Sequence, residues 1–106
     1  MKPKAVIPRE VASRDVDEAI DHYLGEDAVK AALDFIDALE TGYAHIARQP
    51  GSGSPKYAHE LNLPGLRFWP LTRFPYLVFY FEQDDFIDVW RVLREQRDIP
   101  AWMNEP

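Results

Sequence analysis

The stretch PYLVFYFEQDDFIDVWRVLREQRD, residues 75–98, decides the fold, because it contains two strand-like runs with a tight turn between them. Residues 75–83 and 86–93 are apolar runs of strand length, and Asp84 and Asp85 supply the polar turn. The first run is apolar on both of its faces, which is typical of a central, fully buried strand. Alternation places Tyr76, Val78 and Tyr80 on one face and Leu77, Phe79 and Phe81 on the other.

Upstream of this hairpin, residues 66–72 predict a third strand, and Pro70 restricts that strand to a sheet edge or a bulge. Before it lie a short strand at residues 4–8 and two helical patterns, at residues 8–24 and about 27–48. This order is typical of the α+β class. The predicted fold is a short N-terminal strand, an antiparallel helix hairpin and a three-stranded antiparallel meander.

Two helices can cover only one face of this small sheet, and the other face would still carry aromatic side chains. The central strand supplies some of them, and Trp69 and Trp90 are further candidates. Monomeric proteins seldom leave such an apolar patch exposed. One possible cover is a partner chain. The other is the Pro-, Gly- and Ser-rich connection at residues 49–65, expected as a surface loop, folding over together with residues 99–103.

The chain has 106 residues and no cysteine, so we expect a single domain, residues 1–106, without disulfides or thiol chemistry. Its formal net charge is −6, and residues 10–40 carry ten acidic against two basic side chains. This balance argues against nonspecific binding of nucleic acid, and no direct sequence-specific binding is expected either. There is no recognisable secretory leader, and the longest apolar run, residues 76–81, is too short to cross a bilayer. A cytoplasmic protein without membrane contact is therefore predicted.

Three arginines, Arg91, Arg94 and Arg97, gather at the end of the last strand, beside Trp90 and shortly before Trp102. One interpretation is that they pair with Asp88, Glu95, Asp98 or the acidic helices. Such pairing would be a weak reason for the cluster, because an exposed ion pair contributes only about 0–1 kcal/mol. Alternation puts Arg91 on a strand face with Ile87, Val89 and Leu93. We therefore expect Arg91 to be partly buried, and a structural role is favoured over recognition, whereas recognition is favoured for Arg97. Arg94 and Arg97 lie past the strand, where they could contact a target or a partner.

The three histidines give no support for a metal site. His22 and His45 lie on the predicted helices without a second ligand-type residue four positions on, and His59 lies in the connection beside Glu60. A solvated or hydrogen-bonded surface histidine is the expected state of each. The sequence therefore predicts neither a metal nor another cofactor.

Four pieces of the chain form a pattern whose order and spacing are more specific than any one piece. The first is Ala12, Asp15, Val16, Ala19, Ile20 and Tyr23. The second is Ala32, Phe35, Leu39 and Pro50 with the Gly-Ser run after it. The third is YLVFY, residues 76–80, and the fourth is Ile87, Val89, Arg91, Val92, Leu93, Arg97, Asp98 and Ile99. In this pattern the chain resembles the RelE/ParE superfamily of toxins from bacterial toxin–antitoxin modules, in its ParE-like, or plasmid-stabilisation, branch.

The resemblance implies the same β-α-α-β-β-β fold and a function. ParE-like members poison DNA gyrase, and a cognate antitoxin neutralises them by wrapping a segment over apolar toxin surface. Ordering such a segment typically costs about 2–5 kcal/mol of the interaction energy, so the toxin must offer large anchors. The expected anchors are Phe68, Trp69, Tyr76 and Trp90, and the expected recognition residues at the end of the chain are Arg94, Arg97 and Trp102.

The RelE branch instead cleaves ribosome-bound mRNA, which requires groups for proton transfer and cations for the developing phosphorane charge. RelE-like members carry basic residues on the middle strands and an aromatic hydroxyl near the C-terminus. Pro70, Leu71 and Thr72 occupy those strand positions here, and residues 98–106 contain no tyrosine. A gyrase inhibitor without a catalytic residue is therefore the leading hypothesis. The alternatives are an mRNA endonuclease and a degenerate member that keeps only antitoxin binding.

Overall fold

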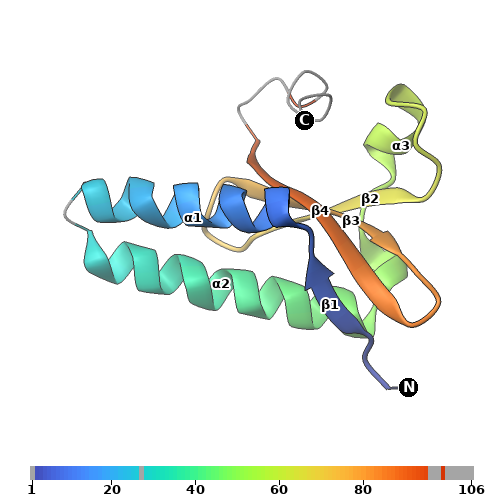
Figure 1. The fold of residues 1–106 in the computed structure, drawn as a ribbon, viewed down its shortest axis with the longest axis horizontal. Helices are drawn as coiled ribbons and strands as arrows, with labels where there is room; N and C mark the ends of the chain where they lie inside the picture. The colour runs from blue at the N-terminus through green and yellow to red at the C-terminus, as the bar shows by residue number, and fades with distance from the viewer. Residues whose placement is uncertain (1, 27, 96–98, 100–106) are drawn as a thin grey trace.

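The computed structural model describes residues 2–26, 28–95 and 99, and Figure 1 shows the arrangement of the elements. They are β1 (Ala5–Pro8), α1 (Glu10–Gly25), α2 (Val29–Arg48), the 3-10 helix η1 (Pro50–Ser52), α3 (Lys56–Glu60), β2 (Leu66–Pro70), β3 (Tyr76–Glu82) and β4 (Phe86–Arg94). The predicted α+β fold is confirmed, with its N-terminal strand, helix hairpin and meander. The sequence did not predict η1 and α3, which lie in the connection at residues 49–65.

The four strands form one sheet in the order β1-β4-β3-β2. The short N-terminal strand β1 runs parallel to β4, and the other neighbours are antiparallel. The central position of β3 explains why it is apolar on both faces. β2 is an edge strand and ends at Pro70, as the missing N–H of proline requires.

The hairpin of α1 and α2 packs on one face of the sheet, and its turn end extends past the sheet (Figure 1). Its buried positions on α2 recur every three or four residues, as an amphipathic helix requires. They are Ala32, Phe35, Leu39, Gly42 and Ile46, and Ala47 beside the last of them is buried as well. Gly42 allows α2 to approach the strands closely, because a Cβ at this position would lie 2.9 Å from the Leu71 side chain. Tyr76, Val78 and Tyr80 share one face, as predicted, and this face is the one that packs against the helices.

The second face of the sheet is covered in part by the connection itself. Leu77 and Phe79 point to this face, and both are buried. Tyr57 of α3 lies over them, with its ring centroid 5.6 Å from that of Phe68 and 5.7 Å from that of Phe79. Ile99 is also buried in this cluster. The chain's own connection therefore covers part of this face, and it forms more than a surface loop.

A β-bulge shifts the side-chain alternation of β4. Phe79 pairs with Arg91 while Tyr80 pairs with Val89, so Trp90 is an extra residue on β4. Ile87 and Val89 before the bulge and Val92 after it belong to the helix-side core, whereas Leu93 belongs to the second face. The prediction that Arg91 shares one strand face with Ile87, Val89 and Leu93 was therefore wrong, because it assumed an unbroken alternation.

Candidate functional site

Arg91 and Asp15 form a buried ion pair between β4 and α1. The Arg91 Nε donates to Asp15 Oδ2 at 2.8 Å, and the Arg91 Nη2 donates to Asp15 Oδ1 at 2.8 Å. The backbone N–H of Val92 donates a further bond to Asp15 Oδ2 at 3.0 Å. Arg91 is 5% exposed and Asp15 is 9% exposed. Two parallel bonds between a planar guanidinium and a carboxylate give this contact a fixed geometry.

The acidic helices were among the partners considered for Arg91, but Asp15 was not singled out, although the sequence contains a signal for it. Asp15 lies three residues after Ala12 and four before Ala19, and both alanines are buried. The carboxylate therefore lies on the core-facing side of α1, where a charge requires a partner. Its charge also acts on Tyr43, whose pKa is raised to about 12, first by burial and second by the negative charge of Asp15.

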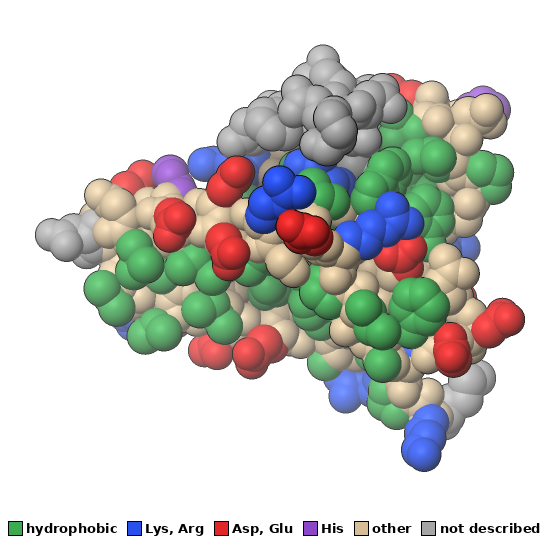
Figure 2. Space-filling model, viewed as in Figure 1, with side chains coloured by type: hydrophobic (Ala, Val, Ile, Leu, Met, Phe, Trp, Pro, Cys, Tyr) green, Lys and Arg blue, Asp and Glu red, His purple; other side chains and the backbone are tan. Residues whose placement is uncertain are grey.

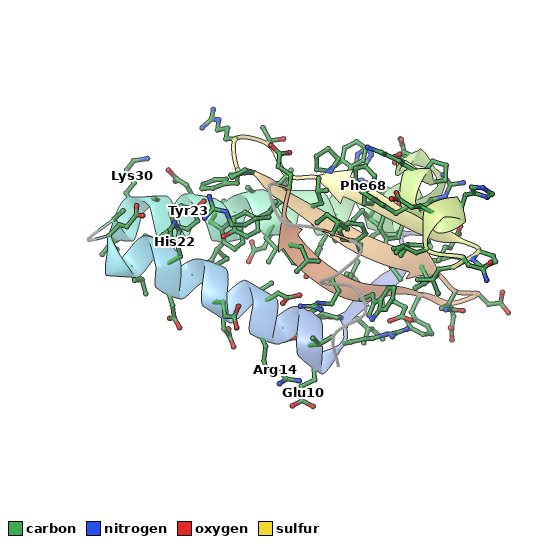
Figure 3. The ribbon with its side chains drawn as sticks, turned by 90° about the horizontal axis from the view of Figure 1, so that it is seen from above. Glu10, Arg14, His22, Tyr23, Lys30 and Phe68 are labelled. Carbon is green, nitrogen blue, oxygen red and sulfur yellow. The ribbon has the colours of Figure 1, made fainter. Side chains whose placement is uncertain are left out.

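Arg94 lies beside a small hollow between α1 and the end of β4. Its guanidinium carbon is 5.8 Å from the ring centroid of Tyr76. The hollow, of about 80 Å³, is also lined by Asp15, Glu18 and His22. Figure 3 shows His22 on α1 near the turn end of the hairpin. Arg94 is half-buried, so it can contact a partner molecule that approaches this end of the sheet.

Trp90 is flanked by an arginine that the sequence analysis did not single out. The Arg9 guanidinium carbon is 5.6 Å from the Trp90 ring centroid, a distance that suits a cation–π contact. Arg9 donates two bonds to Asp88, at 2.9 and 2.7 Å, and these hydrogen bonds are the main reason that the Arg9 pKa is raised. Trp90 also lies 5.8 Å from Phe81, measured between ring centroids. The half-buried indole is thus held on the second face of the sheet.

Comparison with known proteins assigns the family. Residues 6–99 match the model of the ParE toxin of the type II toxin–antitoxin system parDE. The chain belongs to the ParE toxin family. A structure described as the chromosomal ParDE TA system from P. aeruginosa has the same fold, with a TM-score of 0.72 and 22% identity over 86% of this chain and 95% of that one. A search of curated proteins gave no match.

In this ParE-family toxin, two of the predicted anchors lie on the helix side of the sheet. Tyr76 is 4% exposed, and its ring centroid is 5.1 Å from that of Phe35 on α2. Trp69 pairs with Val78 and stacks on His45, with 3.9 Å between the ring centroids. The expectation that Trp69 and Tyr76 are available on the second face was therefore wrong. The register of β2 against β3 turns Trp69 towards the helices, and Tyr76 faces the core between the helices and the sheet.

The other predicted ParE recognition residues divide by position. Phe68 pairs with Phe79 and lies on the second face beside α3, where Figure 3 shows it. Trp90 is half-buried on the second face in the middle of β4, and Arg94 is half-buried at the end of β4. Arg97 and Trp102 lie outside the described residues, so their places stay predictions. Arg91 is buried, and its guanidinium forms an ion pair with Asp15 inside the fold, so its role is structural.

The described part of this ParE-family chain contains no cluster of three or more acidic or histidine side chains that could hold a metal ion. His45 accepts or donates a bond to the Ser52 hydroxyl at 2.9 Å, and His22 lies 3.4 Å from Glu26. Among the described helices, none is both long enough and apolar enough to span a membrane.

Proposed function

We propose that this ParE-family chain inhibits DNA gyrase by binding to it, and that a cognate antitoxin neutralises it by binding in turn. The observation that carries the proposal is the family match over residues 6–99, together with the shared fold. The activity would be exerted in the cytoplasm, where gyrase acts on DNA.

We further propose that Arg94, Trp90 and Phe68 take part in recognition, together with Arg97 and Trp102. The support for Trp90 and Arg94 is that both are partly exposed and that each takes part in a contact between a guanidinium and an aromatic ring. Arg9 lies over the Trp90 ring, and Arg94 lies over the Tyr76 ring. Aromatic and arginine side chains in such positions are the commonest energetic centres of protein interfaces. Phe68 is partly covered by Tyr57, so its share in recognition would require α3 to move or the partner to contact its exposed edge.

Inhibition by binding fits the described residues better than RNA cleavage does. The positions at which RelE-like members carry basic groups hold Pro70 at the end of β2, Leu71, which is buried, and Thr72, which is exposed. None of the three is a basic side chain that could transfer a proton or offset a developing negative charge at neutral pH. We therefore assign no catalytic residue.

The deciding experiment adds the purified chain to DNA gyrase, ATP and relaxed plasmid. Blocked supercoiling and trapped linear DNA are expected. Arg94→Ala should weaken the inhibition by about fivefold or more, the scale of an interface residue that costs over 1 kcal/mol. Arg48→Ala, which removes an exposed arginine at the end of α2, is the matched control and should leave the inhibition unchanged.

Two other outcomes would reject the proposal. A folded chain that leaves supercoiling intact but cleaves mRNA on translating ribosomes would be a RelE-type endonuclease. A folded chain without either activity that still binds an antitoxin would be a degenerate family member.

A further inference from the structure

A charged side chain is held over Trp90 where β1 and β4 meet. Arg9 follows directly after β1, and its backbone N–H donates to the carbonyl oxygen of Val89 at 2.9 Å. Its guanidinium donates to both carboxylate oxygens of Asp88. The guanidinium carbon lies 5.6 Å from the centroid of the Trp90 ring. Arg9 is therefore fixed by the backbone of β4, by a carboxylate and by an indole.

The contact between Arg9 and Asp88 is open to solvent on the arginine side. The Arg9 side chain is 46% exposed, whereas that of Asp88 is 13% exposed. A guanidinium carries N–H donors on more than one edge, and the two bonds to Asp88 use the edge of Nε and Nη2. Among the described residues, no other side chain or carbonyl accepts a bond from Arg9. Its remaining N–H groups are therefore available to an acceptor on another molecule.

Apolar side chains surround Arg9 on the same face of the sheet. Ile7 lies opposite Asp88 in the register of β1 against β4, and it is 52% exposed. Phe81 lies opposite Asp88 on the β3 side, and Phe81 and Trp90 are both half-buried, with 5.8 Å between their ring centroids. Figure 2 shows hydrophobic side chains over the strands beside the start of α1, with basic and acidic side chains among them. We call Ile7, Arg9, Phe81 and Trp90 the β1–β4 surface.

The chemistry of the β1–β4 surface restricts what can bind to it. Arginine and tryptophan are among the side chains that most often dominate the energy of a protein interface. The Arg9 guanidinium attracts a carboxylate and repels a basic group. Ile7 and the exposed edges of the two rings gain free energy when an apolar side chain covers them. The best-fitting partner is therefore a protein segment in which an acidic side chain stands beside apolar ones.

We propose that the β1–β4 surface binds DNA gyrase through such a segment, with Arg9 as a recognition residue and Asp88 as a positioning residue. This inference rests on the proposed function, which already places Trp90 in the contact with gyrase, and it adds the neighbours that complete this contact. Asp88 acts through Arg9, because it holds the guanidinium over the indole before gyrase binds. Less side-chain freedom is then lost on binding.

The test measures binding of purified DNA gyrase to the immobilised full chain by surface plasmon resonance. Arg9→Gln and Asp88→Asn should each weaken binding at least about fivefold, the scale of an interface residue that matters. Because Asp88 acts through Arg9, the double variant should bind within about twofold of Arg9→Gln alone. Lys4 and Glu82 form a second ion pair between the N-terminal segment and the sheet, at 2.8 Å. Lys4→Gln and Glu82→Gln are therefore the matched controls, and each should change the affinity less than about twofold.

A second measurement follows the Trp90 ring without gyrase. The indole N–H of Trp90 gives one cross-peak in a proton–nitrogen NMR spectrum, and its loss in Trp90→Phe assigns it. This cross-peak should shift in Arg9→Gln and in Asp88→Asn, because the cation over the ring is removed or released. It should stay in place in Lys4→Gln. Near-ultraviolet circular dichroism shows that each variant is folded.

The opposite results would overturn the proposal. Unchanged gyrase binding in Arg9→Gln would remove Arg9 from recognition, and additive losses in the double variant would show that Asp88 does not act through Arg9. A loss of the same size in Lys4→Gln would assign the effect to net charge. Variants that bind gyrase normally but lose binding of the purified antitoxin would assign the surface to the antitoxin.

Failure of the proposed function gives a different result from failure of this inference. A folded wild-type chain that does not bind gyrase would reject the proposed function, and with it the partner named here. An indole cross-peak that stays in place in Asp88→Asn would reject the positioning role of Asp88, whatever the chain does to gyrase.

Discussion

At the scale of single residues, the contact between Arg91 and Asp15 differs from the other ion pairs among the described residues because both of its side chains are buried. The side chains of Lys30 and Asp34 are 88% and 44% exposed, and such a pair contributes little to stability. The side chains of Arg91 and Asp15 are 6% and 8% exposed. Water cannot replace either partner there, so removing one leaves the other charge buried without its counter-ion.

Arg91→Ala should therefore lower the free energy of unfolding by about 3–5 kcal/mol, the usual cost of breaking a buried pair from one side. Urea denaturation followed by circular dichroism measures the change. Arg94→Ala removes a half-buried arginine from the same strand and should change stability by less than about 1 kcal/mol. An Arg91 variant as stable as the Arg94 variant would show that the pair contributes nothing to the folded state.

At the scale of elements, the connection between α2 and β2 is held in place by the central strand. The Tyr80 hydroxyl donates to the carbonyl oxygen of Pro50 at 2.6 Å and accepts from the N–H of Gly53 at 3.1 Å. Burial of this ring is the main reason that the Tyr80 pKa is raised. The connection then continues into α3, which covers Phe79 with Tyr57. A segment that composition marks as a loop is therefore part of the packed structure.

Gly53→Ala tests this close approach. A Cβ at Gly53 would overlap the Tyr80 hydroxyl and lie 2.9 Å from the backbone oxygen of Phe68, so either the connection or Tyr80 must shift. We expect a loss of about 1–3 kcal/mol in the free energy of unfolding, as for other overpacked sites. Gly51→Ala, where a Cβ would meet nothing within 4 Å, is the matched control and should stay within about 0.5 kcal/mol of the wild type. Urea midpoints compare the two variants, and equal stability would contradict the described packing.

At the scale of the whole molecule, the first strand of the chain completes the sheet by pairing with the last strand. β1 pairs in parallel with β4, so that Val6 lies opposite Ile87 and Pro8 opposite Val89. Ile87 and Val89 are fully buried, although they would lie at a sheet edge without β1. Arg9 adds its ion pair with Asp88 directly after the strand. The N-terminal strand therefore completes both the sheet and the helix-side core.

Deleting residues 1–8 should lower the free energy of unfolding by about 3 kcal/mol or more, because the buried side chains of β4 become accessible and each contributes about 1.5–3 kcal/mol when fully buried. Thermal unfolding and near-ultraviolet circular dichroism measure the loss. Deleting residues 1–3 leaves the whole of β1 in place and serves as the control. A truncated chain with the stability of this control would refute the role of β1 in closing the fold.

The sequence by itself determined the two long helices, the four strands and the family pattern. The alternation of the central strand correctly placed Tyr76, Val78 and Tyr80 opposite Leu77, Phe79 and Phe81. Pro70 correctly indicated an edge strand, and the helical spacing indicated the two long helices. These features are local, because a strand repeats every two residues and a helix every 3.6, so periodicity along the chain reveals them.

Only the tertiary structure decided which side chains meet across the chain. The bulge at Trp90, the register that turns Trp69 to the helices, and the pairing of Arg91 with Asp15, 76 positions away, all depend on how separate elements pack. The same holds for the cover that α3 provides and for the contact of Arg9 with Trp90. Periodicity shows which side of a helix or strand is apolar. Whether that side becomes core or surface depends on which other elements pack against it.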